Sequence, residues 1–204
     1  PRGRLFLSMD AETGDAPDRL LPLVARRAAG EPLQYVLGAW DFFGREFLLS
    51  RDTLIPRPET EGLVERALSV LRRKGAEPSL AMDVGTGSGV IAVTLAAEEP
   101  AVSVVATDLS AGALRTAREN AGRHGVGGRV RFVRCDADSA LKWGDRFDVV
   151  VSNPPYVADG EWESLPAEVR RHEPPGALRA GPDGLSVLRR IVAGAADLLL
   201  PGGE

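Results

Sequence analysis

The sequence predicts an α/β fold built on an open, parallel sheet, and its second half carries the pattern that predicts it. From residue 80 onward, short apolar strands alternate with segments of helical periodicity. Strands joined through helical crossovers are expected to be parallel neighbours, because antiparallel strands need no such connection. The expected strands are 80–84, 102–107, 129–134 and 147–152, and the expected helices are 89–98, 110–123 and 185–200.

The first half has a different organisation. Residues 16–29 predict a short helix, because apolar residues recur on one helical face before Gly30 and Pro32. The residues of that face are Leu20, Leu21, Val24, Ala25 and Ala28. Residues 36–50 are rich in β-favouring side chains around Gly44, which predicts a hairpin. A helix is then expected to run to about Arg73.

Composition narrows the class of protein. No run of eighteen apolar residues occurs, and the stretch PRGRLFLSMD lacks the apolar core of a signal peptide, so we expect a cytoplasmic protein without membrane contact. A net charge of −4 disfavours a protein that coats duplex nucleic acid. The short basic runs 72–74 and 170–171 are expected to be solvated helix faces.

Metal chemistry is not expected. Cys135 is the single cysteine, and with His124 and His172 it forms no cluster at zinc-ligand spacing. A lone cysteine also forms no disulfide within the chain.

A glycine-rich loop joins the first predicted strand of the sheet to its helix. It reads Gly85-Thr86-Gly87-Ser88-Gly89, directly after Asp83-Val84. Glycines there permit positive φ and close approach of a ligand, and the helix N-terminus offers free N–H groups. The spacing differs from the G-x-G-x-x-G of dinucleotide folds, and no Lys or Arg in the loop awaits a phosphate. A tight turn without a ligand remains the alternative.

Acidic residues follow the next two strands. Asp108 lies 23 residues after Gly85, where a carboxylate can accept both hydroxyls of a ribose. Its alternative role is to cap the helix that starts beside Ser110. Asp136 could accept from an adenine amino group, and the Ala137 N–H could face a ring nitrogen. A nucleoside bound without a phosphate cradle favours S-adenosylmethionine, with S-adenosylhomocysteine as product.

The fourth predicted strand ends in Asn153-Pro154-Pro155-Tyr156, more than a turn requires. The Asn153 oxygen and the Pro154 carbonyl can accept the two N–H groups of a planar amide or amine, and Tyr156 can stack on it. The prolines offer no backbone donor and fix φ. Two acceptors would favour a pyramidal nitrogen, so no general base is needed. A rigid loop with a surface aromatic is the alternative.

These residues resemble the family of peptide chain release factor glutamine methyltransferases, the protein-(glutamine-N5) methyltransferases. The landmarks are GEPLQYVLG, F-x-G-x-x-F, IPRPETEGLVE, DVGTGSGVIAVTLA, VVATDLS, FDVVVSNPPYV and EPPGALRAGPDGL, in family order. The Asn-Pro-Pro-Tyr motif alone is shared with adenine and guanine amino methyltransferases. The combination of PRPETE with GEPLQY singles out the glutamine group.

The resemblance implies a Rossmann-like S-adenosylmethionine-dependent methyltransferase sheet with a partial N-terminal helical domain and a β-hairpin linker. The corresponding ranges are 1–35, 36–57 and 58–204, and the family sheet continues past Glu204. The implied activity is methylation of the glutamine amide in the Gly-Gly-Gln motif of release factors, in translation termination, with no direct nucleic acid required. The implied cofactor-binding residues are Gly85, Thr86, Gly87, Ser88, Gly89, Asp108, Asp136, Ala137 and Asn153.

Residues 153–156 would hold the glutamine. The resemblance also implies that Leu54, Ile55, Arg57, Pro58 and Glu59 roof the methyl site.

Two other hypotheses stay open. An adenine or guanine amino methyltransferase would use the same Asn-Pro-Pro-Tyr motif, but the pI near 5.4 and the PRPETE segment count against it. A donor-binding protein that has lost catalysis would bind S-adenosylmethionine without turnover.

Overall fold

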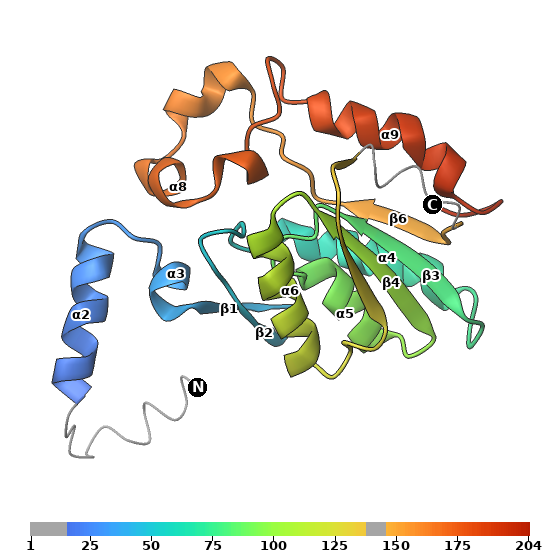
Figure 1. Ribbon diagram of the computed structural model, residues 1–204, viewed down its shortest axis with the longest axis horizontal. Helices are drawn as coiled ribbons and strands as arrows, with labels where there is room; N and C mark the ends of the chain where they lie inside the picture. The colour runs from blue at the N-terminus through green and yellow to red at the C-terminus, as the bar shows by residue number, and fades with distance from the viewer. Residues whose placement is uncertain (1–15, 138–145) are drawn as a thin grey trace.

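The sheet in the computed structural model, which describes residues 16–137 and 146–204, has four parallel strands in the order β5-β4-β3-β6 (Figure 1). These strands are β3 (Ser79–Val84), β4 (Val102–Asp108), β5 (Val130–Arg134) and β6 (Val149–Ser152). All three strand pairings are parallel. The predicted α/β fold with a parallel sheet is therefore confirmed. Strand β3, the first of these four strands along the chain, is one of the two central strands.

Helices cover both faces of this sheet (Figure 1). Side chains alternate along a strand, so Ala81 and Val104 pack with α4 (Glu59–Arg72) and α5 (Val90–Glu98). Met82 and Val105 point to the opposite face, where α9 (Ser186–Leu198) supplies Ile191 and Leu198. The central strands β3 and β4 are mainly apolar because both of their faces are largely buried, whereas the edge strand β5 carries the exposed Arg131 and Arg134. Helix α6 (Ala111–Arg123) lies beside α5 on the first face.

The predicted hairpin is present as β1 (Ala39–Phe42) and β2 (Arg45–Leu48), paired antiparallel. Phe43 and Gly44 both have positive φ, the conformation of the tight turns that suit the twist of a hairpin. The hairpin prediction was wrong at residues 36 and 37, which belong to a short helix, α3 (Leu33–Leu37). Gly38 ends that helix in the left-handed conformation, so it acts as a helix stop before the strand.

Helix α2 (Ala16–Ala28) forms where the sequence predicts it, at the edge of the molecule (Figure 1). Its apolar residues Leu20, Leu21 and Val24 are exposed, as is Leu37 of α3. The division into a helical domain 1–35, a linker 36–57 and a domain 58–204 stays a prediction, and residues 1–15 of it lie outside the described part of the chain.

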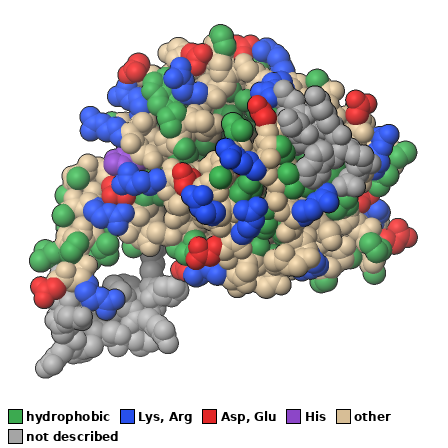
Figure 2. Space-filling model, in the orientation of Figure 1, with side chains coloured by type: hydrophobic (Ala, Val, Ile, Leu, Met, Phe, Trp, Pro, Cys, Tyr) green, Lys and Arg blue, Asp and Glu red, His purple; other side chains and the backbone are tan. Residues whose placement is uncertain are grey.

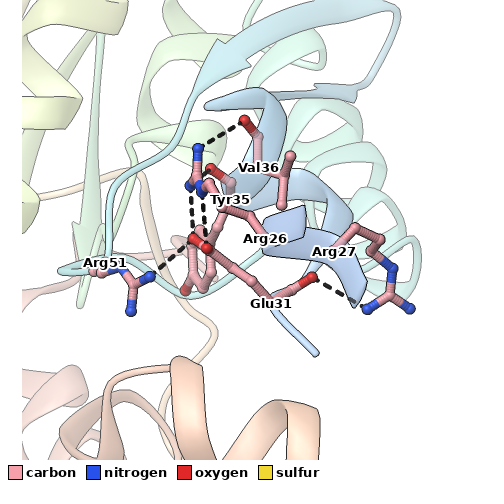
Figure 3. A network of polar contacts seen from close by, with 6 residues as sticks. All are labelled: Arg26, Arg27, Glu31, Tyr35, Val36 and Arg51. Carbon is pink, nitrogen blue, oxygen red and sulfur yellow. Dashed lines mark hydrogen bonds and ion pairs between the residues drawn. The ribbon is translucent and has the colours of Figure 1, made fainter. Parts of the chain in front are cut away.

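A buried carboxylate links α2 to the segment before the hairpin (Figure 3). The Arg26 Nε and Nη2 donate to the two oxygens of Glu31, at 2.9 and 2.7 Å, and Arg51 donates at 2.9 Å. Arg26 also donates to the carbonyls of Tyr35 and Val36. These charge-assisted bonds lower the pKa of Glu31 to about 2.

We expect Glu31→Gln to reduce stability only when Glu31 is ionised. The pKa of the native carboxyl lies below its usual 4.5, so its stabilisation is present above pH 4.5 and is lost as pH falls toward 2. Both arginines are partly exposed, so the loss at pH 7 should be about 1 to 2 kcal/mol. Denaturant unfolding of the parent protein and of Glu31→Gln at pH 7 and pH 2.5 measures the difference in unfolding free energy. An equal difference at the two pH values would contradict this assignment.

Charged side chains of both signs are spread over the face in Figure 2. In the basic run 72–74, Arg72 pairs with Glu99, Arg73 with Glu204, and Lys74 with Asp148. Arg170 pairs with Glu163. Arg72 and Arg170 lie on helices, as predicted, the second on α8 (Ala167–His172). The prediction was wrong for Arg73 and Lys74, which follow the end of α4, and Lys74 pairs with the buried Asp148.

The last residues of the chain lie along the edge of β6. Leu200 N–H donates to the Phe147 carbonyl, and Val150 N–H donates to the Glu204 carbonyl at 2.9 Å. Within residues 16–137 and 146–204, no helix combines the length and apolar character that crossing a membrane requires.

Candidate active site

A cleft of about 460 Å³ opens at the carboxyl ends of the four parallel strands. Each strand contributes to its wall at its last residues or just after them: Val84, Thr107, Cys135 and Ser152. In open α/β sheets, ligands bind at this end of the strands. Most of the residues singled out in the sequence are brought together here.

The glycine loop forms one wall. Gly85, Gly87 and Gly89 have φ of 75°, 58° and 85°, which explains the choice of glycine. Residues 85–88 line the cleft, but Gly89 does not. A methyl group at Gly89 would lie 3.0 Å from the Ala117 Cβ, so this glycine allows α5 and α6 to pack closely.

The side chain of Asp83 is hydrogen-bonded to the glycine loop and to the start of α5, a role that the sequence did not reveal. It is fully buried, and its Oδ2 accepts from the Thr86 hydroxyl at 2.6 Å and from the Ala92 N–H at 3.1 Å. Its Oδ1 has no hydrogen-bond partner in the described residues. Burial raises the pKa of Asp83 to about 7, and the nearby Asp108 charge adds to this. The sequence signal for this role is an acidic residue within an otherwise apolar strand.

Asn120 of α6 is a second buried polar anchor of the loop. Its Oδ1 accepts from Leu48 N–H at 2.8 Å, and its Nδ2 donates to the carbonyls of Leu48 and Ser88. This side chain joins β2, α6 and the glycine loop. Its partners are 72 and 32 residues away in sequence, so no local pattern could identify it.

Asp108 lies at the end of β4 and faces the cleft. Its Oδ2 accepts from Gly87 N–H at 2.9 Å and its Oδ1 from Ser110 N–H at 2.8 Å. Burial raises its pKa despite these bonds. Ser110 Oγ accepts from Ala113 N–H, so Ser110, and not Asp108, is the N-cap of α6. Asp108 therefore braces both the glycine loop and the turn before α6.

Asp136 and Ala137 also line the cleft, but they contact each other. Asp136 Oδ1 accepts from Ala137 N–H at 2.7 Å and pairs with Arg190 at 2.9 Å. A ligand that used the groups proposed for adenine would have to replace these contacts.

The segment after β6 forms the facing wall. Ser152 Oγ donates to the Val84 carbonyl at 2.7 Å, which ties the ends of β6 and β3 together. Asn153, Pro154 and Pro155 line the cleft. Asn153 Nδ2 donates to the Thr60 hydroxyl at 3.1 Å, which leaves its Oδ1 as an acceptor. Tyr156 is 61% exposed and does not line the cleft.

A buried ion pair holds the segment that was expected to roof the site. Glu173 is 3% exposed and accepts from Arg57 Nη2 at 2.5 Å and from Ile55 N–H at 3.2 Å. Leu54 and Arg57 line the cleft, together with Pro174, which follows Glu173. Ile55 instead packs inward against Tyr35 and Leu49.

Pro58 and Glu59 are absent from the cleft wall in the described structure, whereas Thr60 forms part of it. Thr60 and Glu173 were therefore missed as individual site residues, although PRPETE and EPPGALRAGPDGL contain them. No metal-binding cluster of three His, Cys, Asp or Glu side chains occurs in residues 16–137 and 146–204.

Comparison with known sequences identifies close relatives. Residues 64–170 match the Methyltransferase small domain family. A release factor glutamine methyltransferase of Nitratidesulfovibrio vulgaris is 50% identical over 181 residues, which cover 89% of this chain and 60% of the relative. The enzyme of the same name from Chlorobaculum tepidum is 46% identical, covering 98% of this chain and 71% of the relative. The chain thus spans about two thirds of the length of these relatives.

Solved structures support the fold. The hMettl16 catalytic domain, in complex with an RNA hairpin of the MAT2A 3'UTR, has a TM-score of 0.58 at 17% identity, covering 76% of this chain and 58% of that one. Precorrin 8w decarboxylase of Methanobacterium thermoautotrophicum has a TM-score of 0.51 at 24% identity, covering 77% and 66%. At these identities the likeness concerns the fold alone. The sequence relatives show the family: because of its similarity to them, the chain belongs to the release factor glutamine methyltransferase family.

Proposed function

We propose that this chain transfers a methyl group from S-adenosylmethionine to the side-chain amide nitrogen of the glutamine in the Gly-Gly-Gln motif of peptide chain release factors. The observation that carries the proposal is one cleft with two unlike walls. One wall has the glycine loop and Asp108, and the other has the acceptors of Asn153 and Pro154. A donor on the first wall would lie beside an amide on the second. The names of the sequence relatives supply the identity of the amide.

The donor wall suits a nucleoside without phosphate. Gly85 and Gly87 leave open space where a side chain would be, so a ligand can approach the backbone closely. Asp108 is held by Gly87 and Ser110, with its carboxylate at the cleft surface, where it can accept from ribose hydroxyls. We assign residues 85–88, Asp136 and Ala137 to the same ligand, and Gly89 to the packing that shapes the loop.

The acceptor wall suits a primary amide. Asn153 Oδ1 can accept one N–H of the glutamine amide, and the Pro154 carbonyl the other. Pro154 and Pro155 present no backbone N–H that would repel those hydrogens. We retain Tyr156 as a stacking residue, because a protein substrate that covers the cleft would bury its exposed ring.

The reaction follows from this grip. When bound, the sulfonium of S-adenosylmethionine supplies an electrophilic methyl carbon. With this donor bound, the amide lone pair would form the new N–C bond, and the electrons of the broken S–C bond would stay on sulfur. Two acceptors on the N–H groups favour the pyramidal, positively charged nitrogen of the transition state. The proton then leaves the acidic nitrogen for solvent.

Mass spectrometry of a release factor incubated with the full chain and S-adenosylmethionine tests the proposal. We expect a gain of one methyl group on the Gly-Gly-Gln peptide. A factor with glutamate in place of that glutamine is the matched control and should stay unmodified. If the factor stayed unmethylated and DNA or RNA incubated in the same way gained a methyl group, the proposal would be wrong. The chain would then be an amino methyltransferase that acts on nucleic acid.

We expect Asp108→Asn to weaken donor binding about tenfold or more, because the amide that replaces the carboxylate accepts less strongly from ribose hydroxyls. Calorimetric titration with S-adenosylhomocysteine measures the effect, with the exposed Asp197→Asn as control. A donor analogue without ribose hydroxyls should bind both proteins with similar affinity. An equal loss for that analogue would mean that Asp108 only braces the loop.

A further inference from the structure

We propose that Thr60 is a positioning residue for the substrate amide, because its hydroxyl anchors the Asn153 side chain at the cleft wall. The inference rests on the proposed function and extends it to a residue of α4. Thr60 is in the first turn of α4, is 4% exposed and lines the cleft. Its Oγ1 accepts from Asn153 Nδ2 at 3.1 Å across 93 residues of sequence.

The two ends of an asparagine amide have nearly the same shape and opposite hydrogen-bonding character. A half-turn about the Cβ–Cγ bond of Asn153 would exchange the positions of its oxygen and its NH₂ group. The NH₂ group would then meet the N–H groups of the substrate amide, and the grip would be lost. A threonine hydroxyl can accept from Nδ2 or donate to Oδ1, so it does not by itself choose between the two ends. In the structure it accepts from Nδ2, and this bond anchors the Asn153 side chain at the cleft wall with Oδ1 available to the substrate.

The position of the Thr60 hydroxyl is itself well defined. Thr60 N–H donates to the Arg57 carbonyl at 3.0 Å, and Arg57 is paired with buried Glu173. Pro58 stands at the start of α4, where its ring fixes φ. Threonine is β-branched, so few side-chain rotamers are open to it in a helix. The Thr60 hydroxyl that accepts from Asn153 is therefore held in place by the fixed N-terminus of α4.

Thr60→Val tests the hydroxyl, because valine keeps the shape and removes the acceptor. We expect kcat for the Gly-Gly-Gln substrate to fall about 10- to 100-fold, with the donor Kd changed less than about twofold. Thr60→Ser should restore most of the rate. Thr94→Val is the matched control: Thr94 is fully buried in α5, and its hydroxyl has no hydrogen-bond partner in the described residues. It should keep the kcat of the parent protein.

The same substitution in the Asn153→Ala background separates positioning from general structural damage. A residue that acts through Asn153 should cost little once Asn153 is gone, whereas structural damage would cost the same in both backgrounds. A parent-like kcat in Thr60→Val, or an equal loss in the two backgrounds, would overturn the inference.

A second readout does not depend on activity. The ¹⁵N side-chain amide signals of Asn153, identified by their loss in Asn153→Ala, should shift in Thr60→Val and much less in Thr60→Ser. Unchanged signals in Thr60→Val would refute the contact. If the parent protein failed to methylate the factor, the proposed function would fail, while these signals would still report on the Thr60 contact.

Discussion

Asn153→Ala is expected to lower the single-turnover rate of methyl transfer about 100- to 1000-fold, the size of the loss when one preorganised hydrogen-bonding group is removed from an active site. The reason is that Asn153 Oδ1 meets an N–H group whose charge grows in the transition state. The donor Kd should change less than about threefold, since the glycine loop and Asp108 stay in place. Rapid-quench kinetics with a saturating donor measures the rate.

Two controls accompany this variant. Its thermal unfolding should match that of the parent protein within a few degrees, because Asn153 is only partly buried. Asn153→Asp keeps an acceptor but replaces the NH₂ group that donates to Thr60, and it should recover only part of the rate. A rate for Asn153→Ala within about threefold of the parent value would remove Asn153 from the proposed chemistry.

Glu173→Ala is expected to have the largest effect on stability, about 2 to 4 kcal/mol, because it breaks a buried ion pair and leaves Ile55 N–H without its acceptor. Arg57 is about one third exposed, so water relieves part of the cost. Methyl transfer should also slow, since Arg57, which pairs with Glu173, and Pro174, which follows Glu173 in sequence, both line the cleft. Denaturant unfolding and single-turnover kinetics measure the two effects.

Glu168→Gln is the matched control for this prediction. Glu168 pairs with Arg27 at 3.4 Å, and both side chains are more than a third exposed. Surface pairs of this kind contribute about 0 to 1 kcal/mol. The double variant Glu173→Ala/Arg57→Ala should lose less than the sum of its single variants. Equal costs for the two glutamate substitutions would show that Glu173 is not the brace we describe.

The parallel sheet could be predicted because its signals are local. Strands β3, β4 and β6 are short and mainly apolar, β5 is rich in β-favouring residues, and helix α6 shows apolar residues at helical spacing. The glycine loop and Asp108 could be placed at one edge for the same reason. Consecutive parallel strands all end on the same side of the sheet, so whatever follows them converges.

Other features depend on contacts that a local pattern does not contain. Asn153 meets Thr60 across 93 residues, and Glu173 meets Ile55 across 118. Helix α3 was hidden because its residues also favour strands, and Gly38 was not recognised as a helix stop. The apolar face of α2 correctly predicted a helix but not its exposure, since periodicity does not say what a face packs against.

A crystal structure of the full chain with S-adenosylhomocysteine and a Gly-Gly-Gln peptide tests the central claim most directly. The glutamine amide nitrogen should lie about 3 Å from both Asn153 Oδ1 and the Pro154 carbonyl oxygen, on the side where the donor's methyl group would stand. Asn153 Nδ2 should still donate to Thr60. A glutamine bound elsewhere, or an Asn153 amide turned so that its NH₂ group faces the substrate, would contradict the account.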